Sequence, residues 1–172
     1  MHIIADTHLH SSFSNDSDTP MEAMIQQGIK KGLRIMCFTE HQDEDFPDTP
    51  GYPALPNNLV ETDSYLYDIL RFREKYQDQI TLLFGIELGL QPHVADFNTN
   101  YAKSYPFDFI IGSSHVCQGM NPYYPLFFAD KTDETAYRLY FESILQNLLV
   151  FDDFDVYGHL DYIVRYGKNP NQ

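Results

Sequence analysis

Short apolar runs alternate with helix-like stretches along the chain, and this alternation restricts the possible folds more than any other feature. The apolar runs predict five strands, at residues 3–6, 33–39, 80–87, 107–113 and 155–158. The stretches between them predict helices at about residues 19–31, 61–76, 94–105 and 132–151. Strands that alternate with helices are typical of parallel βαβ units. We therefore expect an α/β fold with a buried parallel sheet.

The helix predicted at residues 19–31 has clear boundary signals. Thr19 at the N-cap, Pro20 at the first helical position and Glu22 at the third form a capping-box pattern. Gly32 follows the last turn, where glycine commonly ends a helix.

Composition limits the class of protein. The chain has 172 residues, of which 43% are hydrophobic, so we expect residues 1–172 to form one globular domain. The net charge of −14 repels nucleic-acid phosphates and anionic membranes, so neither is an expected partner. No signal peptide or membrane-length apolar run is visible, and two cysteines are too few for a disulfide framework. These absences predict a cytoplasmic location.

Potential metal ligands stand at the ends of all five predicted strands. Residues two apart on a strand point the same way, so His8 and His10 can direct two imidazoles at one point. The other four strands are followed by, or end in, one candidate each: His41, Glu87, His115 and His159. Because carboxyl ends of parallel strands gather at one edge of a sheet, we expect a metal centre there. Mixed imidazole and carboxylate ligands suit zinc, iron or manganese.

The order of these motifs resembles the polymerase and histidinol phosphatase (PHP) family. The matching segments are Asp6-x-His8-x-His10, Thr39-Glu40-His41, Gly85-Ile86-Glu87, Gly112-Ser113-Ser114-His115 and Gly158-His159-Leu160-Asp161. The resemblance extends from residue 2 to about residue 167, and residues 158–166 look most like the histidinol phosphatase branch. It implies a distorted, seven-stranded β/α barrel that binds up to three divalent metal ions. This chain has only about five of the βα units of such a barrel.

The resemblance also implies roles for individual residues. His8 and His10 match ligands of a first metal, and Glu87 matches the carboxylate that bridges the first and second metals. His115 and His159 match the remaining ligands of the second metal.

A third metal would be held by Asp16 and His41. Asp18 is a near neighbour of Asp16, and Asp16 could instead be a solvated loop carboxylate or a helix-capping group. We expect Asp6 and Glu40 to orient ligands by hydrogen bonding from behind them.

The sequence departs from the family pattern after His159. The family normally supplies a late Asp-x-His motif, and none follows His159 before Gln172. We therefore expect a C-terminally shortened form, whether an artificial truncation, a proteolytic product or a naturally short gene. The first and third metals would each lose one ligand. The open barrel edge would favour a homo-oligomer or exchange of elements between two copies.

The expected reaction is metal-dependent hydrolysis of L-histidinol phosphate to L-histidinol and phosphate, a step of histidine biosynthesis, through attack by a metal-activated hydroxide. Arg165 would clamp the phosphate, although a surface salt bridge is its plainer interpretation. Asp43, Glu44 and Asp45 could meet the cationic groups of this substrate or could be a solvated loop.

Two alternatives stay open. The chain could hydrolyse another small phosphate ester or a nucleotide with the same machinery. It could also be a metal-binding module with little turnover, which the missing Asp-x-His motif favours. A nucleic-acid enzyme is disfavoured by the charge of −14 and the lack of a basic stripe.

Overall fold

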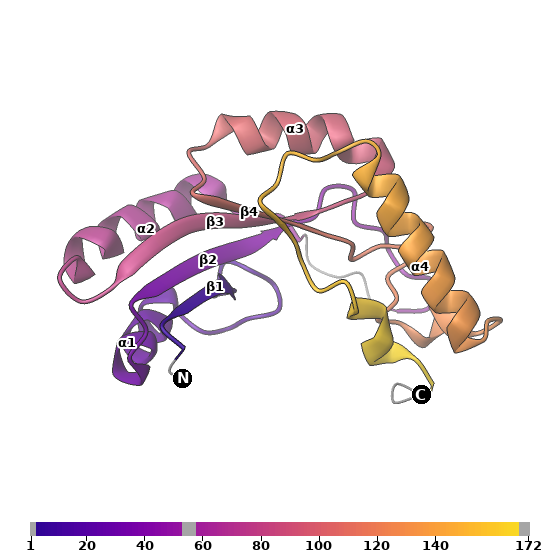
Figure 1. The fold of residues 1–172 in the computed structure, drawn as a ribbon, viewed down its shortest axis with the longest axis horizontal. Helices are drawn as coiled ribbons and strands as arrows, with labels where there is room; N and C mark the ends of the chain where they lie inside the picture. Colours follow the sequence, from indigo (N-terminus) through magenta and orange to yellow (C-terminus); the bar gives the residue numbers. More distant parts are fainter. Residues whose placement is uncertain (1–2, 53–57, 169–172) are drawn as a thin grey trace.

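Five parallel strands form one curled sheet in the same order as they occur in the chain (Figure 1). The computed structural model describes residues 3–52 and 58–168. The strands are β1 (Ala5–Leu9), β2 (Ile35–Gln42), β3 (Thr81–Gly89), β4 (Phe109–Ser113) and β5 (Val156–Tyr157). The sheet is a curled part of a β/α barrel, which confirms the expected fold class and the five βα units.

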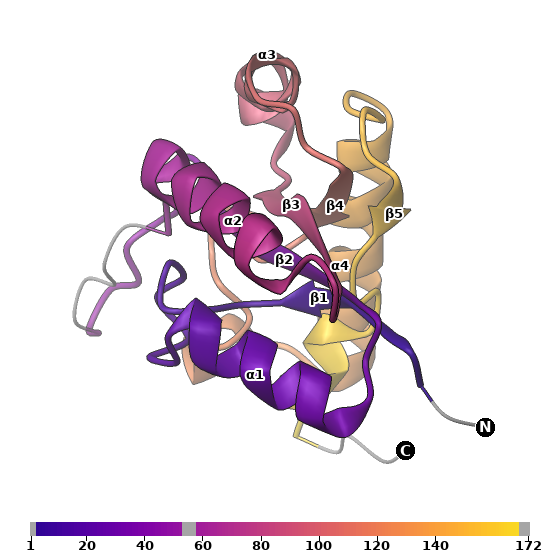
Figure 2. The same ribbon diagram turned by 90° about the vertical axis from the view of Figure 1, so that its left-hand side faces the viewer.

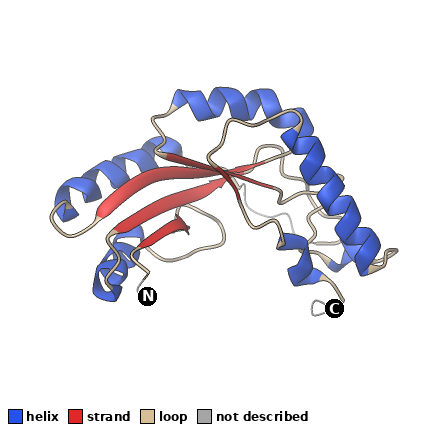
Figure 3. Cartoon of the chain, in the orientation of Figure 1, coloured by secondary structure: helices blue, strands red, loops and turns tan. Residues whose placement is uncertain are grey.

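The α-helices of the described residues pack around the sheet, as Figures 2 and 3 show. They are α1 (Met21–Lys31), α2 (Thr62–Tyr76), α3 (Ala95–Ser104) and α4 (Asp133–Leu148). Three short 3₁₀ helices follow strands or loops, namely η1 (Pro92–Val94), η2 (Pro125–Phe128) and η3 (Tyr162–Tyr166). The sequence analysis predicted neither η2, which lies between β4 and α4, nor η3, which follows β5. Among the described residues, no helix has the length and apolarity needed to cross a bilayer.

The main core lies between the sheet and the first two helices. Ile25 of α1 and Ile69 of α2 pack with Phe38, Phe84 and Ile86 of β2 and β3, and all five are fully buried. Burying such side chains contributes about 1.5–3 kcal/mol each. This packing fixes the two central strands, which in turn supply the most buried residues of the candidate site.

The boundaries of the first two strands differ from the prediction. The first strand covers residues 5–9 rather than 3–6, because pairing with β2 begins at Ala5 opposite Ile35. Ile3 and Ile4 are 77% and 52% exposed, so their apolar character does not reflect burial here. β2 continues to Gln42 instead of ending at residue 39. His8 and His41 consequently lie within strands rather than beyond them.

β1 contains a register irregularity beside the site. Asp6 pairs with Met36 and Leu9 pairs with Phe38, so two residues of β1 oppose one of β2. A bulge of this kind changes the direction of nearby side chains. The rings of His8 and His10 nevertheless meet as expected, with centroids 4.9 Å apart, and their nitrogens belong to one ligand group.

The predicted capping box at the start of α1 is not formed. The helix begins at Met21, with Pro20 at the N-cap position and no side-chain cap bond within the described residues 3–52. Glu22 instead accepts hydrogen bonds from Tyr76, at 2.8 Å, and from Lys75 of α2. These partners from another helix compete with the local cap. Gly32 ends the helix as predicted, with φ of 85°.

Candidate metal centre

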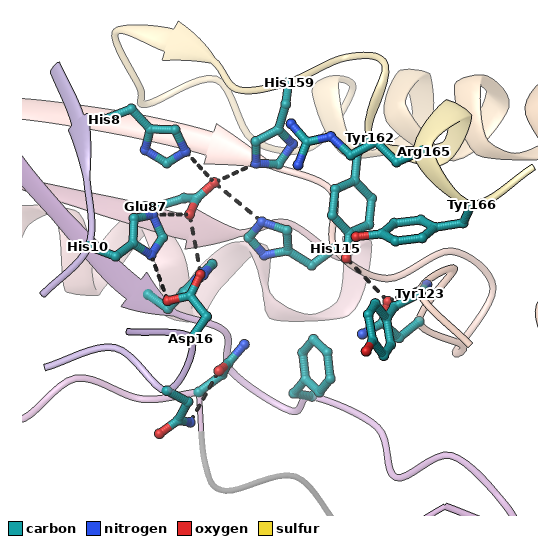
Figure 4. A pocket seen from close by; sticks show the side chains of 15 residues that line it. His8, His10, Asp16, Glu87, His115, Tyr123, His159, Tyr162, Arg165 and Tyr166 are labelled. Carbon is teal, nitrogen blue, oxygen red and sulfur yellow. Dashed lines mark hydrogen bonds and ion pairs between the residues drawn. The ribbon is translucent and has the colours of Figure 1, made fainter. Parts of the chain in front are cut away.

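Glu87 lies at the centre of the candidate site, on the middle strand β3 (Figure 4). Its side chain is fully buried, and its register partner on β2 is His41. Ser113, the last residue of β4, donates a hydrogen bond of 2.7 Å to Oε1. The pairing of three neighbouring strands therefore holds this carboxylate at the carboxyl edge of the sheet.

Five imidazoles surround the carboxylate. Their nearest ring nitrogens lie 2.9–3.5 Å from a Glu87 oxygen, and they belong to His8, His10, His41, His115 and His159. His10 follows β1 directly, whereas His115 and His159 lie two residues beyond β4 and β5. The structure thus brings together all the histidines that the sequence analysis singled out as ligands.

The ligand atoms form four overlapping groups. In each group the donor atoms lie within 4.8 Å of one another: His8–His10–Glu87, His10–Asp16–His41, His41–Asp43–His115 and Glu87–His115–His159. The first, second and fourth groups correspond to the three metal sites that the family resemblance implies. Their assignment as metal ligands stays a prediction.

The geometry fits divalent metals. Zinc–ligand distances of about 2.0–2.2 Å place two ligand atoms of a tetrahedral site about 3.4 Å apart, close to the separations around Glu87. Glu87 Oε2 and His41 Nδ1 are buried, and among the described residues their contacts of 3.2–3.3 Å with charged groups lack the geometry of well-formed hydrogen bonds. Buried polar atoms without partners are costly, and a bound metal would satisfy both.

Asp16 reaches the site from the loop after β1. Its oxygens lie 3.2 Å from His10 Nδ1 and 3.5 Å from His41 Nε2, while its side chain is 59% exposed. The pairing with these two histidines favours a ligand role for Asp16 over its interpretation as a solvated loop carboxylate. The pKa of Asp16 is held below its usual value by hydrogen bonds from His10 and His41.

The carboxylates of the cluster raise the pKa values of two imidazoles, those of His10 and His41. Burial alone would lower the pKa of His10, but hydrogen bonds with Asp16 and Glu87 raise it to about 9. For His41, burial is again opposed by hydrogen bonds with Asp16 and Asp43, and the pKa rises to about 9. Metal ions and protons therefore compete for the same nitrogens.

The most buried pair shows the same effect. Burial would lower the pKa of His115, but the charges of Asp43 and Glu87 raise it well above 6.5. Burial would raise the pKa of Glu87, but the surrounding imidazoles, His115 foremost, hold it well below the usual value. His8 differs, because burial lowers its pKa despite the neighbouring carboxylate. The site is thus strongly suited to cations.

The residues behind the imidazoles differ from those expected. Thr39 Oγ1 lies 2.8 Å from His8 Nδ1 and orients that ring, a role the sequence analysis did not assign. Asp6 accepts only a 3.4 Å hydrogen bond from the backbone N–H of His8. The Thr-Glu-His motif could have indicated this role. Thr39 lies two residues before His41 on β2, and residues two apart on a strand point the same way.

Glu40 anchors a loop, and within the described part of the chain its hydrogen bonds go to Ser11 and Ser14 rather than to an imidazole. It is fully buried and accepts hydrogen bonds of 2.6 Å from the hydroxyls of Ser11 and Ser14. Ser14 Oγ also accepts from the backbone N–H of His41, at 3.0 Å. Glu40 therefore fixes the start of the loop that carries Asp16.

A cavity of about 620 Å³ opens over the cluster. Arg165 of η3 lines it together with the rings of Phe46, Tyr123, Tyr162 and Tyr166. Figure 4 shows Arg165 and these tyrosines on the side of the cavity next to His115 and His159. Among residues 3–52 and 58–168, the guanidinium makes no ion pair, so the surface salt bridge considered for Arg165 is not seen.

The acidic residues after β2 differ in exposure: Asp43 is buried, whereas the Asp45 side chain is 73% exposed, as expected for a solvated loop. Asp43 is 3% exposed, lies against His115 and does not line the cavity. Asp45 pairs with His93 at 2.8 Å. The backbone carbonyls of Glu44 and Asp45 accept from the Gln91 side chain. The hypothesis that Asp43 meets the cationic groups of a substrate is therefore wrong, because protein groups already surround its carboxylate.

The chain combines parallel β/α units with a histidine-rich cluster at the carboxyl ends of the strands. This arrangement is typical of β/α-barrel proteins that bind metal ions at one mouth of the barrel. The family model described as the PHP domain matches residues 6–172. The chain belongs to the PHP domain family.

Named relatives support this assignment. The "Histidinol-phosphatase" of Lactococcus lactis is 33% identical over 163 residues, which are 94% of this chain and 58% of the relative. The "Probable histidinol-phosphatase" of Clostridium acetobutylicum is 30% identical over 95% of this chain and 60% of its own. The crystal structure of the Lactococcus lactis histidinol phosphate phosphatase, complexed with zinc, L-histidinol and phosphate, matches with a TM-score of 0.86 at 32% identity. That match covers 95% of this chain and 60% of the other, so this chain spans about 60% of the relatives' length.

Proposed function

We propose that this chain is a metal-dependent phosphoesterase that hydrolyses L-histidinol phosphate to L-histidinol and phosphate. The observation that carries the proposal is one cavity lined by a buried carboxylate, five imidazoles and a guanidinium that has no ion pair with the described residues. Cation-binding groups beside a phosphate-binding arginine suit phosphoryl chemistry. The complex of the Lactococcus lactis relative with zinc, L-histidinol and phosphate supports the choice of substrate.

The metals would be zinc, iron or manganese, up to three per chain. His8, His10 and Glu87 would hold the first, Glu87, His115 and His159 the second, and Asp16 with His41 the third. Divalent metals in such a site lower the pKa of water and polarise phosphoryl oxygens.

The chain's own groups have three tasks. Arg165 binds phosphate oxygens, because its planar guanidinium can donate two parallel hydrogen bonds. The rings of Tyr123, Tyr162 and Tyr166 line the same cavity and offer apolar surface to the carbon skeleton of the substrate. Glu40 and Thr39 keep the Asp16 loop and the His8 ring in place.

Phosphate release from L-histidinol phosphate by zinc- or manganese-loaded protein tests the proposal. We expect kcat/KM far above that for p-nitrophenyl phosphate, and no turnover after chelation. Equal, slow rates on both esters would favour a phosphoesterase for another small phosphate ester or a nucleotide. Tight metal binding without turnover on any ester would favour the metal-binding module.

Two further expectations belong with this proposal. β1 and β5 each have one unpaired side within the described sheet, so association with a second copy stays a prediction that light scattering tests. A cytoplasmic location likewise stays a prediction, which fractionation of cells that express the chain tests.

A further inference from the structure

Asp43 has no role in the scheme above, yet it is one of the most buried charged residues of the chain. It follows β2 directly and is 3% exposed. Its Oδ1 accepts from His115 Nδ1 at 2.7 Å, and its Oδ2 accepts from the Asn58 side chain at 2.7 Å. Its backbone N–H donates to Asn58 O at 2.8 Å. The carboxylate is therefore held from two directions. Its Oδ2 also lies 3.3 Å from His41 Nδ1, but its shortest contact with a ring is the one to His115.

The hydrogen bond leaves the other nitrogen of His115 free for the metal centre. With Nδ1–H donated to Asp43, Nε2 is the nitrogen that would give its lone pair to a metal, and it lies 3.3 Å from Glu87 Oε1. Metal-binding histidines commonly donate their second N–H to a carboxylate, which fixes the tautomer and increases the basicity of the ligand nitrogen.

Gly89 makes room for this carboxylate. A Cβ atom on Gly89 would lie 1.8 Å from Asp43 Oδ1 and 3.1 Å from Asp43 Cα. Gly89 ends β3, two residues after Glu87, so the strand that supplies the central carboxylate also leaves the space for its neighbour. Any larger residue would push the Asp43 carboxylate away from His115.

We propose that Asp43 is a positioning residue that holds His115 in the Nδ1–H tautomer and aims its Nε2 at the metal centre, and that Gly89 is required for this arrangement. This rests on the proposed function. In this arrangement Asp43 Oδ1 and His115 Nδ1 do not share a metal, because their separation of 2.7 Å is a hydrogen-bond length, shorter than the roughly 3.4 Å between two ligand atoms of one zinc site.

Zinc affinity, measured by competition with a chromogenic chelator on folded protein, tests the proposal without relying on turnover. Asp43→Asn and Asp43→Ala should weaken zinc binding by about 10- to 100-fold, with the larger loss for alanine. Asp45→Asn is the matched control, because Asp45 is two residues away, exposed and paired with His93. It should bind zinc like the unmodified chain.

A double-mutant cycle separates positioning from general damage. Gly89→Ala should weaken zinc binding to a similar extent as Asp43→Ala, and it should have little further effect once Asp43 is alanine. In the zinc-loaded protein, ¹⁵N NMR of His115 should show protonated Nδ1 and coordinated Nε2, and Asp43→Ala should lose this single tautomer.

Three results would overturn the inference. They are unchanged zinc affinity in Asp43→Ala, additive losses in the double mutant, or loss of one whole zinc equivalent with the remaining affinity intact, which would make Asp43 a ligand. If the unmodified chain binds no zinc, the proposed function fails first, so the two failures are distinguishable.

Discussion

Glu87 is the single residue on which most of the cluster depends. One fully buried carboxylate lies within 3.5 Å of five imidazole nitrogens, and it belongs to two of the four ligand groups. No other described residue has so many of the candidate ligands as neighbours. Its charge stabilises bound cations and protonated imidazoles alike.

Replacing Glu87 with glutamine keeps the shape and removes the charge. We expect Glu87→Gln to lose at least one equivalent of bound zinc, because two ligand groups lose their carboxylate. Metal analysis of protein purified with excess zinc measures this. Glu142→Gln, on the exposed side of α4, should retain the full zinc content. Equal zinc content in both variants would contradict the central role of Glu87.

Arg165 should affect substrate rather than metal. Hydrogen bonds to a charged group contribute about 1.5–3 kcal/mol, so Arg165→Met should lower kcat/KM for L-histidinol phosphate by about 10- to 100-fold. Zinc content should stay unchanged. Arg138→Met on the surface of α4 is the matched control. A normal kcat/KM in Arg165→Met would exclude contact with the phosphate.

At the scale of elements, the sequence predicts the order of strands and the convergence of their ends. His41, Glu87 and His115 could be assigned to one edge because parallel strands present their carboxyl ends together. The bulge beside His8 could not be predicted, because it depends on the register between β1 and β2. The burial of Asp43 was equally hidden, since it needs a glycine from a strand distant in the sequence.

β3 tolerates little change beside Glu87. A Cβ on Gly85 would lie 2.6 Å from Cys37 Sγ and 2.8 Å from the Phe38 carbonyl oxygen. Because backbone cannot move aside cheaply, Gly85→Ala should destabilise the fold by about 1–3 kcal/mol. Denaturant unfolding measures this.

Gly28→Ala in α1 is the comparison for Gly85→Ala. Its new Cβ would meet the Met36 side chain, whose sulfur and methyl can rotate away, and alanine favours a helix. The loss of stability should therefore be clearly smaller. A loss for Gly28→Ala as large as that for Gly85→Ala would show that side-chain and backbone obstruction cost the same here.

At the scale of the whole molecule, stability should depend on pH in opposite ways with and without metal. In the metal-free protein, His10 and His41 have pKa values of about 9, above the ordinary 6.5. The folded state then binds more protons than the unfolded state between these values. Their contribution to stability is complete below pH 6.5 and is lost as the pH rises through 9.

Urea unfolding of chelator-treated protein at pH 6.5 and at pH 9 measures this loss, and the midpoint should fall. Zinc affinity should rise over the same interval, because protons cease to compete for the imidazoles. A midpoint that rises with pH in the metal-free protein would contradict the pKa values of the cluster.

The curl of the sheet brings its two edge strands close together at the candidate metal centre. β1 and β5 are the two outermost strands, yet the rings of His8 and His159 lie 5.8 Å apart. A metal held by these rings together with Glu87 would link β1 and β5, the two edges of the described sheet. Closing so long a stretch of chain is entropically costly, and a bound metal offsets that cost. Metal removal should therefore speed amide hydrogen exchange at both edges of the sheet and leave its centre slow.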